Sequence, residues 1–174
     1  MSRNIATIIL AAGLGKRMKS GLAKVLHPVA GRPMFLYTVS VAEEISSAKI
    51  IAVVGHQADR VRDALAGRNV EIALQAEQKG TADAVRTGMD SLKDYKGTVV
   101  ILCGDVPLIT SETIKHLLSV HDEEKASVTV LTTEVEDPSG YGRIVRNPDG
   151  LIARIVEDRD AGAGIKQISE VNTG

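Results

Sequence analysis

The sequence is poor in cysteine and in aromatic side chains, and both shortages exclude classes of protein. A single cysteine, Cys103, excludes an intramolecular disulfide and a zinc site built from cysteines. Aromatic residues make up 2% of the chain and tryptophan is absent, so the core must be aliphatic. The same scarcity removes the stacking platforms on which single-stranded nucleic acid binds. The 4 histidines show no metal-binding spacing, which argues against a zinc site of any kind.

An excess of charge and a long apolar run are also missing. A formal net charge of -1 gives no general attraction to nucleic acid or to anionic membranes, so any phosphate site must be local. No segment reads as a bilayer span or as a signal peptide, and a cytoplasmic enzyme is the default expectation. The 174 residues, 44% of them hydrophobic, suffice for one domain with a real core.

Apolar, β-branched runs alternate with segments of helical periodicity over most of the chain. The predicted strands are residues 6–10, 50–54, 70–74, 99–102 and 128–131, and the predicted helices are residues 33–44, 58–66, 82–89 and 111–121. Pro33 suits the first turn of its helix and Ser111 suits a helix cap. This alternation predicts an α/β fold with a mostly parallel sheet and helices on both faces. Ligands then bind at the carboxyl ends of the strands.

The pattern changes after about Thr133. Residues 142–146 and 151–156 flank a turn at residues 147–150 and predict a β-hairpin. The last residues, 168–174, predict a strand that is cut off before it closes any sheet.

The segment from Ile8 to Lys24 is the most informative part of the chain. An apolar strand runs into a turn of small residues, and Arg17 and Lys24 follow within a short loop. Gly13 and Gly15 have no Cβ, so backbone N–H groups can approach a phosphate chain closely. Arg17 can grip a phosphate as a fork, and Lys24 adds a compact charge. These features predict a nucleoside triphosphate site, although the glycines alone also fit a simple strand-to-helix turn.

A second signal is Asp105, which follows a buried strand and a glycine. This position puts a carboxylate at the ligand edge of the sheet, where Mg²⁺ binds through one or two carboxylates and substrate phosphate oxygens. Asp105 is therefore the predicted metal ligand, with a turn cap before Pro107 as the alternative. Cys103 reads as a small buried hydrophobe without a catalytic role.

The sequence from Leu10 to Met34 resembles the signature of the sugar-nucleotide pyrophosphorylases, and most of all the bacterial N-acetylglucosamine-1-phosphate uridyltransferase domain. The matching runs are Leu10-Ala11-Ala12-Gly13-x-Gly15-x-Arg17-Met18, Lys24-Val25-Leu26-His27, Gly31-x-Pro33-Met34 and, further on, Gly104-Asp105-Val106-Pro107-Leu108. Two positions depart from the pattern: the family usually has threonine where Lys16 stands and proline where Ala23 stands.

The resemblance implies a Rossmann-like nucleotide-diphospho-sugar transferase fold and a Mg²⁺-dependent reaction. UTP and N-acetylglucosamine 1-phosphate would give UDP-N-acetylglucosamine, a cell-wall precursor, and pyrophosphate. Arg17 and Lys24 would be catalytic and Asp105 would bind the metal. The implied nucleotide contacts are Leu10, Ala11, Ala12, Gly13, Lys24, Gln75, Gly80, Thr81 and Asp105, and the implied sugar contacts are Gly142, Glu157 and Asn172. Gln75 would read the uracil edge, while Thr81 could also simply cap the next helix.

The resemblance covers nearly all of the chain, but the chain covers only part of the family's domain. Residues 1–174 are therefore expected to form an incomplete nucleotidyltransferase domain. The second metal ligand and the β-helix acetyltransferase domain of the bifunctional enzymes, which are expected to be homotrimers, lie beyond it. Two alternatives stay open: a nucleotide-binding fragment with impaired catalysis, and a pyrophosphorylase for another sugar or nucleotide.

Overall fold

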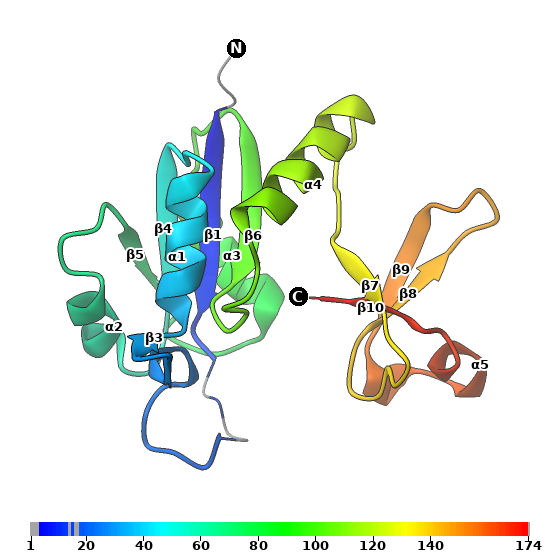
Figure 1. Cartoon of the computed structure of the whole chain (residues 1–174), viewed down its shortest axis with the longest axis horizontal. Helices are drawn as coiled ribbons and strands as arrows, with labels where there is room; N and C mark the ends of the chain where they lie inside the picture. Colours follow the sequence, from blue (N-terminus) through cyan, green and yellow to red (C-terminus); the bar gives the residue numbers. More distant parts are fainter. Residues whose placement is uncertain (1–3, 14, 16–17, 174) are drawn as a thin grey trace. The chain divides into compact units, whose positions relative to one another are not determined.

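The computed structural model of the chain describes residues 4–13, 15 and 18–173. The chain divides into two compact units, Met1–Lys115 and His116–Gly174, and the boundary falls within one helix. Figure 1 shows the elements of each unit. No helix in the described part of the chain is both long and apolar enough to cross a membrane.

The first unit is built on a four-stranded parallel sheet. Its strands are β1 (Ile5–Ala11), β4 (Lys49–Val54), β5 (Glu71–Leu74) and β6 (Thr98–Cys103), in the order β5-β4-β1-β6. β1 is central because it pairs in parallel with both β4 and β6. The predicted α/β fold with a mostly parallel sheet is confirmed.

Helices cover both faces of this sheet. They are α1 (Phe35–Glu44), α2 (Ala58–Ala64) and α3 (Thr81–Asp90), and α4 (Ser111–Glu123) follows β6. Successive residues of a strand point to opposite faces, so Ile9 joins one aliphatic core with α1 and α2, whereas Ile8 joins the other with α3. In Figure 1, α1 lies in front of β1 and α3 lies behind it. Burial on both faces explains why these strands are continuously apolar in the sequence.

Two predictions about helix starts are wrong: the first residue of α1 and the residue that caps α4, although α4 does begin at Ser111 as predicted. Pro33 lies in β3 (Arg32–Pro33), which pairs with β2 (Pro28–Val29), and α1 begins only at Phe35. The tight turn between these strands has positive φ angles at Ala30 and Gly31 and directs the chain back along β2. Pro33 therefore pairs with Pro28 in a hairpin and does not begin the helix. At α4, Thr110 rather than Ser111 acts as the cap, because its Oγ1 accepts a hydrogen bond from the Thr113 N–H at 3.2 Å.

The second unit is an antiparallel sheet. Its strands are β7 (Thr132–Glu134), β8 (Arg143–Arg146), β9 (Ile152–Val156) and β10 (Glu170–Asn172), in the order β7-β10-β8-β9. The predicted hairpin is confirmed as β8 and β9. A short 3-10 helix, η3 (Asp158–Asp160), and α5 (Ala163–Lys166) connect β9 to β10.

Two strand predictions in this unit are wrong. The strand expected at 128–131 lies at Thr132–Glu134, and Val128 is 78% exposed, so the apolar run there does not enter a core. The strand predicted within residues 168–174 is β10, but it does not end outside the sheet as expected. It lies between β7 and β8, because Glu170 pairs with Glu134 and Val171 pairs with Arg143.

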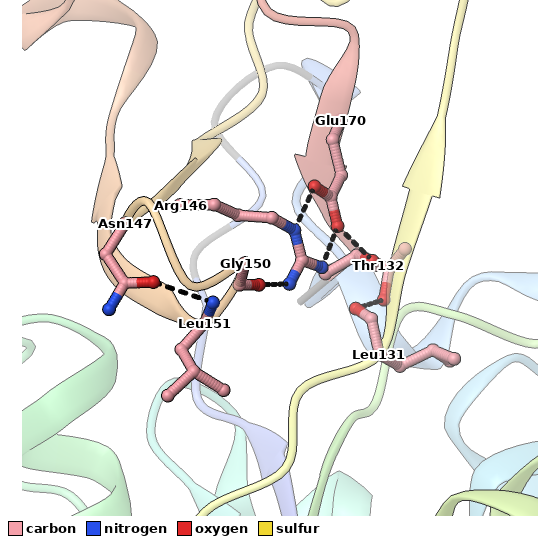
Figure 2. A network of polar contacts seen from close by, with 8 residues as sticks. Leu131, Thr132, Arg146, Asn147, Gly150, Leu151 and Glu170 are labelled. Carbon is pink, nitrogen blue, oxygen red and sulfur yellow. Dashed lines mark hydrogen bonds and ion pairs between the residues drawn. The ribbon is translucent and has the colours of Figure 1, made fainter.

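A polar network fixes β10 in this place, as Figure 2 shows. The Arg146 guanidinium donates to both carboxylate oxygens of Glu170, at 2.8 and 2.6 Å, and to the Gly150 carbonyl at 2.6 Å. Thr132 Oγ1 donates to the same carboxylate at 2.8 Å. The hydrogen bonds from Arg146 hold the pKa of Glu170 below its usual value, and those to Glu170 raise the pKa of Arg146. The bidentate Arg146–Glu170 pair joins β8 to β10, and the Thr132 hydrogen bond joins β7 to them.

Candidate functional site

Loops at the carboxyl edge of the parallel sheet line a pocket of about 210 Å³. The loops follow β1, β5 and β6, whose carboxyl ends meet at this edge. The lining residues are Leu10, Ala12, Gly13, Lys24, Val25, Gln75, Gln78, Thr81, Ala84, Cys103 and Asp105. Most of the nucleotide contacts predicted from the sequence are therefore gathered in one place.

Two predicted nucleotide contacts, Ala11 and Gly80, are not among the described residues that line the pocket. Ala11 is 2% exposed, and its side chain belongs to the core on the side of α1. Gly80 precedes α3, where its carbonyl accepts from Ala84 N–H at 3.1 Å. Arg17 lies outside the described residues. Thr81 does line the pocket, but its side chain makes no capping hydrogen bond, so that alternative is wrong.

Lys24 and Asp105 form a direct ion pair between Nζ and Oδ2. Their side chains are 35% and 34% exposed, so the pair faces the pocket rather than the core. The backbone at Gly15 fixes the stem of the lysine, because a Cβ there would lie 2.6 Å from Lys24 Cβ and the φ angle is +59°. Only glycine satisfies both the close approach and the left-handed conformation.

Gln57, which the sequence analysis did not single out, holds the loop that presents Lys24. Its Oε1 accepts from the Ala23 N–H at 3.0 Å, and its Nε2 donates to the Gly21 carbonyl at 2.6 Å. Gln57 has a left-handed backbone (φ 60°), which costs a non-glycine residue about 1 kcal/mol. Ala23 is 2% exposed and stands where the family usually has proline, so its N–H needs an internal partner. No local pattern could reveal a contact between residues so far apart in the sequence.

Asp83 is a second residue that the sequence analysis missed. It lies in the first turn of α3, and its Oδ2 accepts from the Gln75 side-chain Nε2 at 2.8 Å. Gln75 is 5% exposed, and the same Nε2 also donates to the Gly80 carbonyl at 3.3 Å. The hydrogen bond from Gln75, followed by that from Arg86, holds the pKa of Asp83 below its usual value. A second amide, Gln78 Nε2, donates to the Ala12 carbonyl and so joins the loops after β5 and β1.

The pocket offers a divalent metal one carboxylate. Among the described residues there is no group of three or more His, Cys, Asp or Glu side chains that could hold a metal ion. Asp105 still fits Mg²⁺, because this ion commonly takes one or two carboxylates and completes its shell with phosphate oxygens and water. Burial, with a smaller contribution from Asp105, raises the pKa of the Cys103 thiol, which keeps it neutral and unsuited to metal binding.

The predicted sugar contacts converge within the second unit. A Cβ built at Gly142 would lie 3.6 Å from Glu157 Oε1 and 3.8 Å from Asn172 Cβ, and Asn172 N–H donates to the Gly142 carbonyl at 2.8 Å. Arg143 supports this cluster: it is 2% exposed and forms a 3.1 Å ion pair with Asp158. Its guanidinium also donates to the carbonyl of Tyr141, which precedes Gly142. Arg143 therefore links Tyr141 to Asp158, the residue that follows Glu157.

The parallel sheet, the small-residue loop after β1 and the lysine–carboxylate pair at the carboxyl edge define a nucleotidyltransferase domain. Residues 7–168 match the MobA-like NTP transferase domain family, and the chain belongs to that family. The resemblance found in the sequence motifs agrees with this assignment.

The chain is also similar to named bacterial proteins over nearly all of its length. The chain is 52% identical over 174 residues to the bifunctional protein GlmU of Halalkalibacterium halodurans, with all of the chain and 38% of the relative aligned. It is 48% identical over 172 residues to GlmU of Geobacter sulfurreducens, with 98% of the chain and 36% of the relative aligned. The chain thus spans little more than a third of the length of these proteins.

A solved structure supports the fold. The chain superposes with a TM-score of 0.73 on a Bacillus anthracis protein assigned as a glucose-1-phosphate thymidylyltransferase, covering 98% of this chain and 69% of that one. At 22% identity this likeness concerns the fold alone. It confirms the predicted nucleotide-sugar transferase fold.

Proposed function

We propose that the chain is the part of a pyrophosphorylase that transfers a uridylyl group from UTP to N-acetylglucosamine 1-phosphate. The products are UDP-N-acetylglucosamine and pyrophosphate. The observation that carries the proposal is the Lys24–Asp105 pair in a pocket that Gln75 also lines. About 50% identity to GlmU proteins supports the choice of substrates. The reaction is expected in the cytoplasm, at the precursor stage of cell-wall synthesis, and the full-length protein is expected to be a homotrimer.

In the proposed reaction, the first unit would bind the nucleotide. The triphosphate would lie along the loop formed by Leu10, Ala11, Ala12 and Gly13, with the base at Gln75, Gly80 and Thr81. Asp105 would hold Mg²⁺, which, when bound, neutralises phosphate charge as a Lewis acid. Lys24 would stabilise charge on the α-phosphoryl group, and Arg17 would neutralise the leaving pyrophosphate.

The sugar half falls to the second unit. The Gly142 N–H would donate to the N-acetyl carbonyl, and the Glu157 carboxylate would accept from sugar hydroxyl groups. Asn172 could donate and accept beside them. The convergence of these three residues in one cluster supports this assignment.

The chemistry needs no general base. A phosphate oxygen of the sugar 1-phosphate attacks the α-phosphorus of UTP, and the bond from that phosphorus to the bridging oxygen of pyrophosphate breaks. The nucleophile is already an anion at neutral pH, so alignment and charge stabilisation suffice. None of the described residues that line the pocket is a histidine, which agrees with such a mechanism.

The test is release of pyrophosphate from UTP and N-acetylglucosamine 1-phosphate in the presence of Mg²⁺. We expect Asp105→Asn to abolish release, whereas Asp94→Asn, a change at an exposed aspartate, should preserve it. Calorimetric titration with UTP separates the alternatives. Binding without release would make the chain a nucleotide-binding fragment, and faster release from dTTP or with another sugar phosphate would assign a different pyrophosphorylase.

A further inference from the structure

The orientation of the Gln75 amide is fixed by its surroundings. Two acceptors face its nitrogen: the Asp83 carboxylate at 2.8 Å and the Gly80 carbonyl at 3.3 Å. Neither can donate a hydrogen bond, because the carboxylate is ionised and a carbonyl carries no proton. Rotating the amide by 180° would place its oxygen against both of them. The side chain therefore keeps its nitrogen toward α3.

This arrangement leaves one polar atom of Gln75 for a ligand. Both amide hydrogens are used within the protein, and among the described residues no hydrogen bond reaches Oε1. Gln75 is 5% exposed and lines the pocket, so its side chain has little freedom to choose another rotamer. A glutamine normally reads a ligand as donor or acceptor, but Gln75 can act there only as an acceptor.

We propose that Asp83 is a positioning residue that fixes Gln75 as a hydrogen-bond acceptor and thereby selects UTP over CTP. The inference rests on the proposed function, because it takes Gln75 as the residue that faces the base. Uracil presents an N–H at ring position 3, which Oε1 can accept. Cytosine presents a lone pair at the same atom, which would face the lone pairs of Oε1. A site built around a fixed polar group rejects a ligand that leaves this group unpaired.

Asp83 is suited to this role by its own partners. Its second oxygen pairs with Arg86 at 2.5 Å, so the carboxylate is held from both sides. The pKa of Asp83 lies below its usual value, and the carboxylate stays ionised over the range in which enzymes are assayed. The negative charge also lies in the first turn of a helix, where the helix dipole favours it.

The experiment is calorimetric titration of the intact chain with UTP and with CTP. The unchanged protein should prefer UTP. Asp83→Ala removes the charged acceptor and leaves only the Gly80 carbonyl, so the ratio of the two affinities should fall by about tenfold or more. Asp83→Asn keeps an oxygen that can still accept from Gln75 and should give an intermediate ratio. Arg86→Gln is the matched control, because it breaks the ion pair on α3 but keeps the Asp83 carboxylate.

The outcomes separate the two proposals. A preference for UTP that both Asp83 variants retain would overturn the role of Asp83 and leave the proposed function intact. If the unchanged chain bound neither nucleotide, or preferred CTP, both proposals would be wrong. An equal loss of preference in Arg86→Gln would assign the effect to the ion pair rather than to the Gln75 amide. Thermal melting of each variant checks the fold, and Asp83→Ala introduces the strongest helix former, so it should fold.

Discussion

At the scale of single residues, the site contains two opposite charges that neutralise each other. Lys24 and Asp105 are in contact, although each has a separate task in the proposed reaction. A metal ion at Asp105 must therefore displace the ammonium group of Lys24 or share the carboxylate with it. The ion pair keeps both side chains in the pocket while no substrate neutralises them.

Replacing Lys24 should have opposite effects on turnover and on metal binding. We expect Lys24→Met to lower the rate of pyrophosphate release by at least about tenfold, or about 1.4 kcal/mol, because a charge at the α-phosphoryl group is lost. The same change frees the carboxylate of Asp105, so Mg²⁺ should bind more tightly in the absence of nucleotide. Steady-state kinetics and calorimetric titration with Mg²⁺ measure the two effects.

The control for this pair of measurements is Lys49→Met. Lys49 is an exposed lysine at the first residue of β4, at the other end of the sheet. Both the rate and the affinity for Mg²⁺ should be unchanged in it. A Lys24→Met variant that releases pyrophosphate at the normal rate would remove Lys24 from the mechanism.

At the scale of elements, the loop before Lys24 depends on a side chain that follows β4. Gln57 satisfies the buried N–H of Ala23 and pays for this with a left-handed backbone. The φ angle of Ala23, -56°, is one that proline also adopts. A proline there would need no partner, and a glycine at position 57 would carry no strain. Ala23 and Gln57 therefore form an alternative to the proline expected at position 23 from the resemblance to the pyrophosphorylase signature.

A double-mutant cycle tests this relation. Gln57→Gly should destabilise the chain by about 1 kcal/mol, because an unpaired buried N–H outweighs the strain that is relieved. Ala23→Pro should also destabilise it, since Gln57 loses a partner. The double variant should be as stable as the original chain or more stable. It should also restore any loss in the rate of pyrophosphate release that the single variants show. Single effects that simply add would contradict the coupling.

The close contact of α3 with the sheet gives a second prediction at this scale. A Cβ at Gly88 would lie 2.7 Å from Ile8 Cγ2 and 3.0 Å from Val53 Cγ2. Gly88→Ala should therefore lower the free energy of unfolding by about 1–3 kcal/mol, although alanine favours helices. Gly164→Ala in α5 is the control, because nothing lies within 4 Å of its Cβ position. Urea denaturation of the two variants makes the comparison.

The elements also show which features a sequence can predict. β1, β4 and β6 were predictable because burial on both faces makes their sequences continuously apolar. Asp105 was predictable from its place after such a strand. By contrast, the hydrogen bonds of Gln57 depend on where distant loops meet, which no local pattern encodes. The Gln75–Asp83 hydrogen bond was missed because it depends on how the connection between β5 and α3 folds back on itself. The place of β10 was missed for the same reason, since its partners are fixed by tertiary contacts such as Arg146–Glu170.

At the scale of the whole molecule, acid should weaken the chain partly through Glu170. The pKa of this carboxyl is lowered from its usual 4.5, so folding favours its ionised form. The resulting stabilisation is present above the unfolded value and is lost as the pH falls through the lower folded value. A chain with Glu170→Gln lacks this contribution at every pH.

Thermal melting of both proteins between pH 3 and pH 7 tests this expectation. The original chain should melt at a higher temperature near pH 7, and the difference should shrink as the pH falls below about 4. Asp83 and Asp137 also have lowered pKa values, so both proteins should lose stability in acid. Only the difference between the two curves reports on Glu170. A difference that stays constant down to pH 3 would contradict its link to ionisation.

The central position of β1 has a consequence for how the chain is made. Ile5 in β1 pairs with Thr98 in β6. β1 is therefore synthesised long before this partner strand. At ribosomal speeds of about 5–20 residues per second, that delay is on the order of 5–20 s. Until then one edge of β1 is open, and the loop that carries Asp105 has not been made. The pocket is therefore complete only after β6 has been made and has paired with β1.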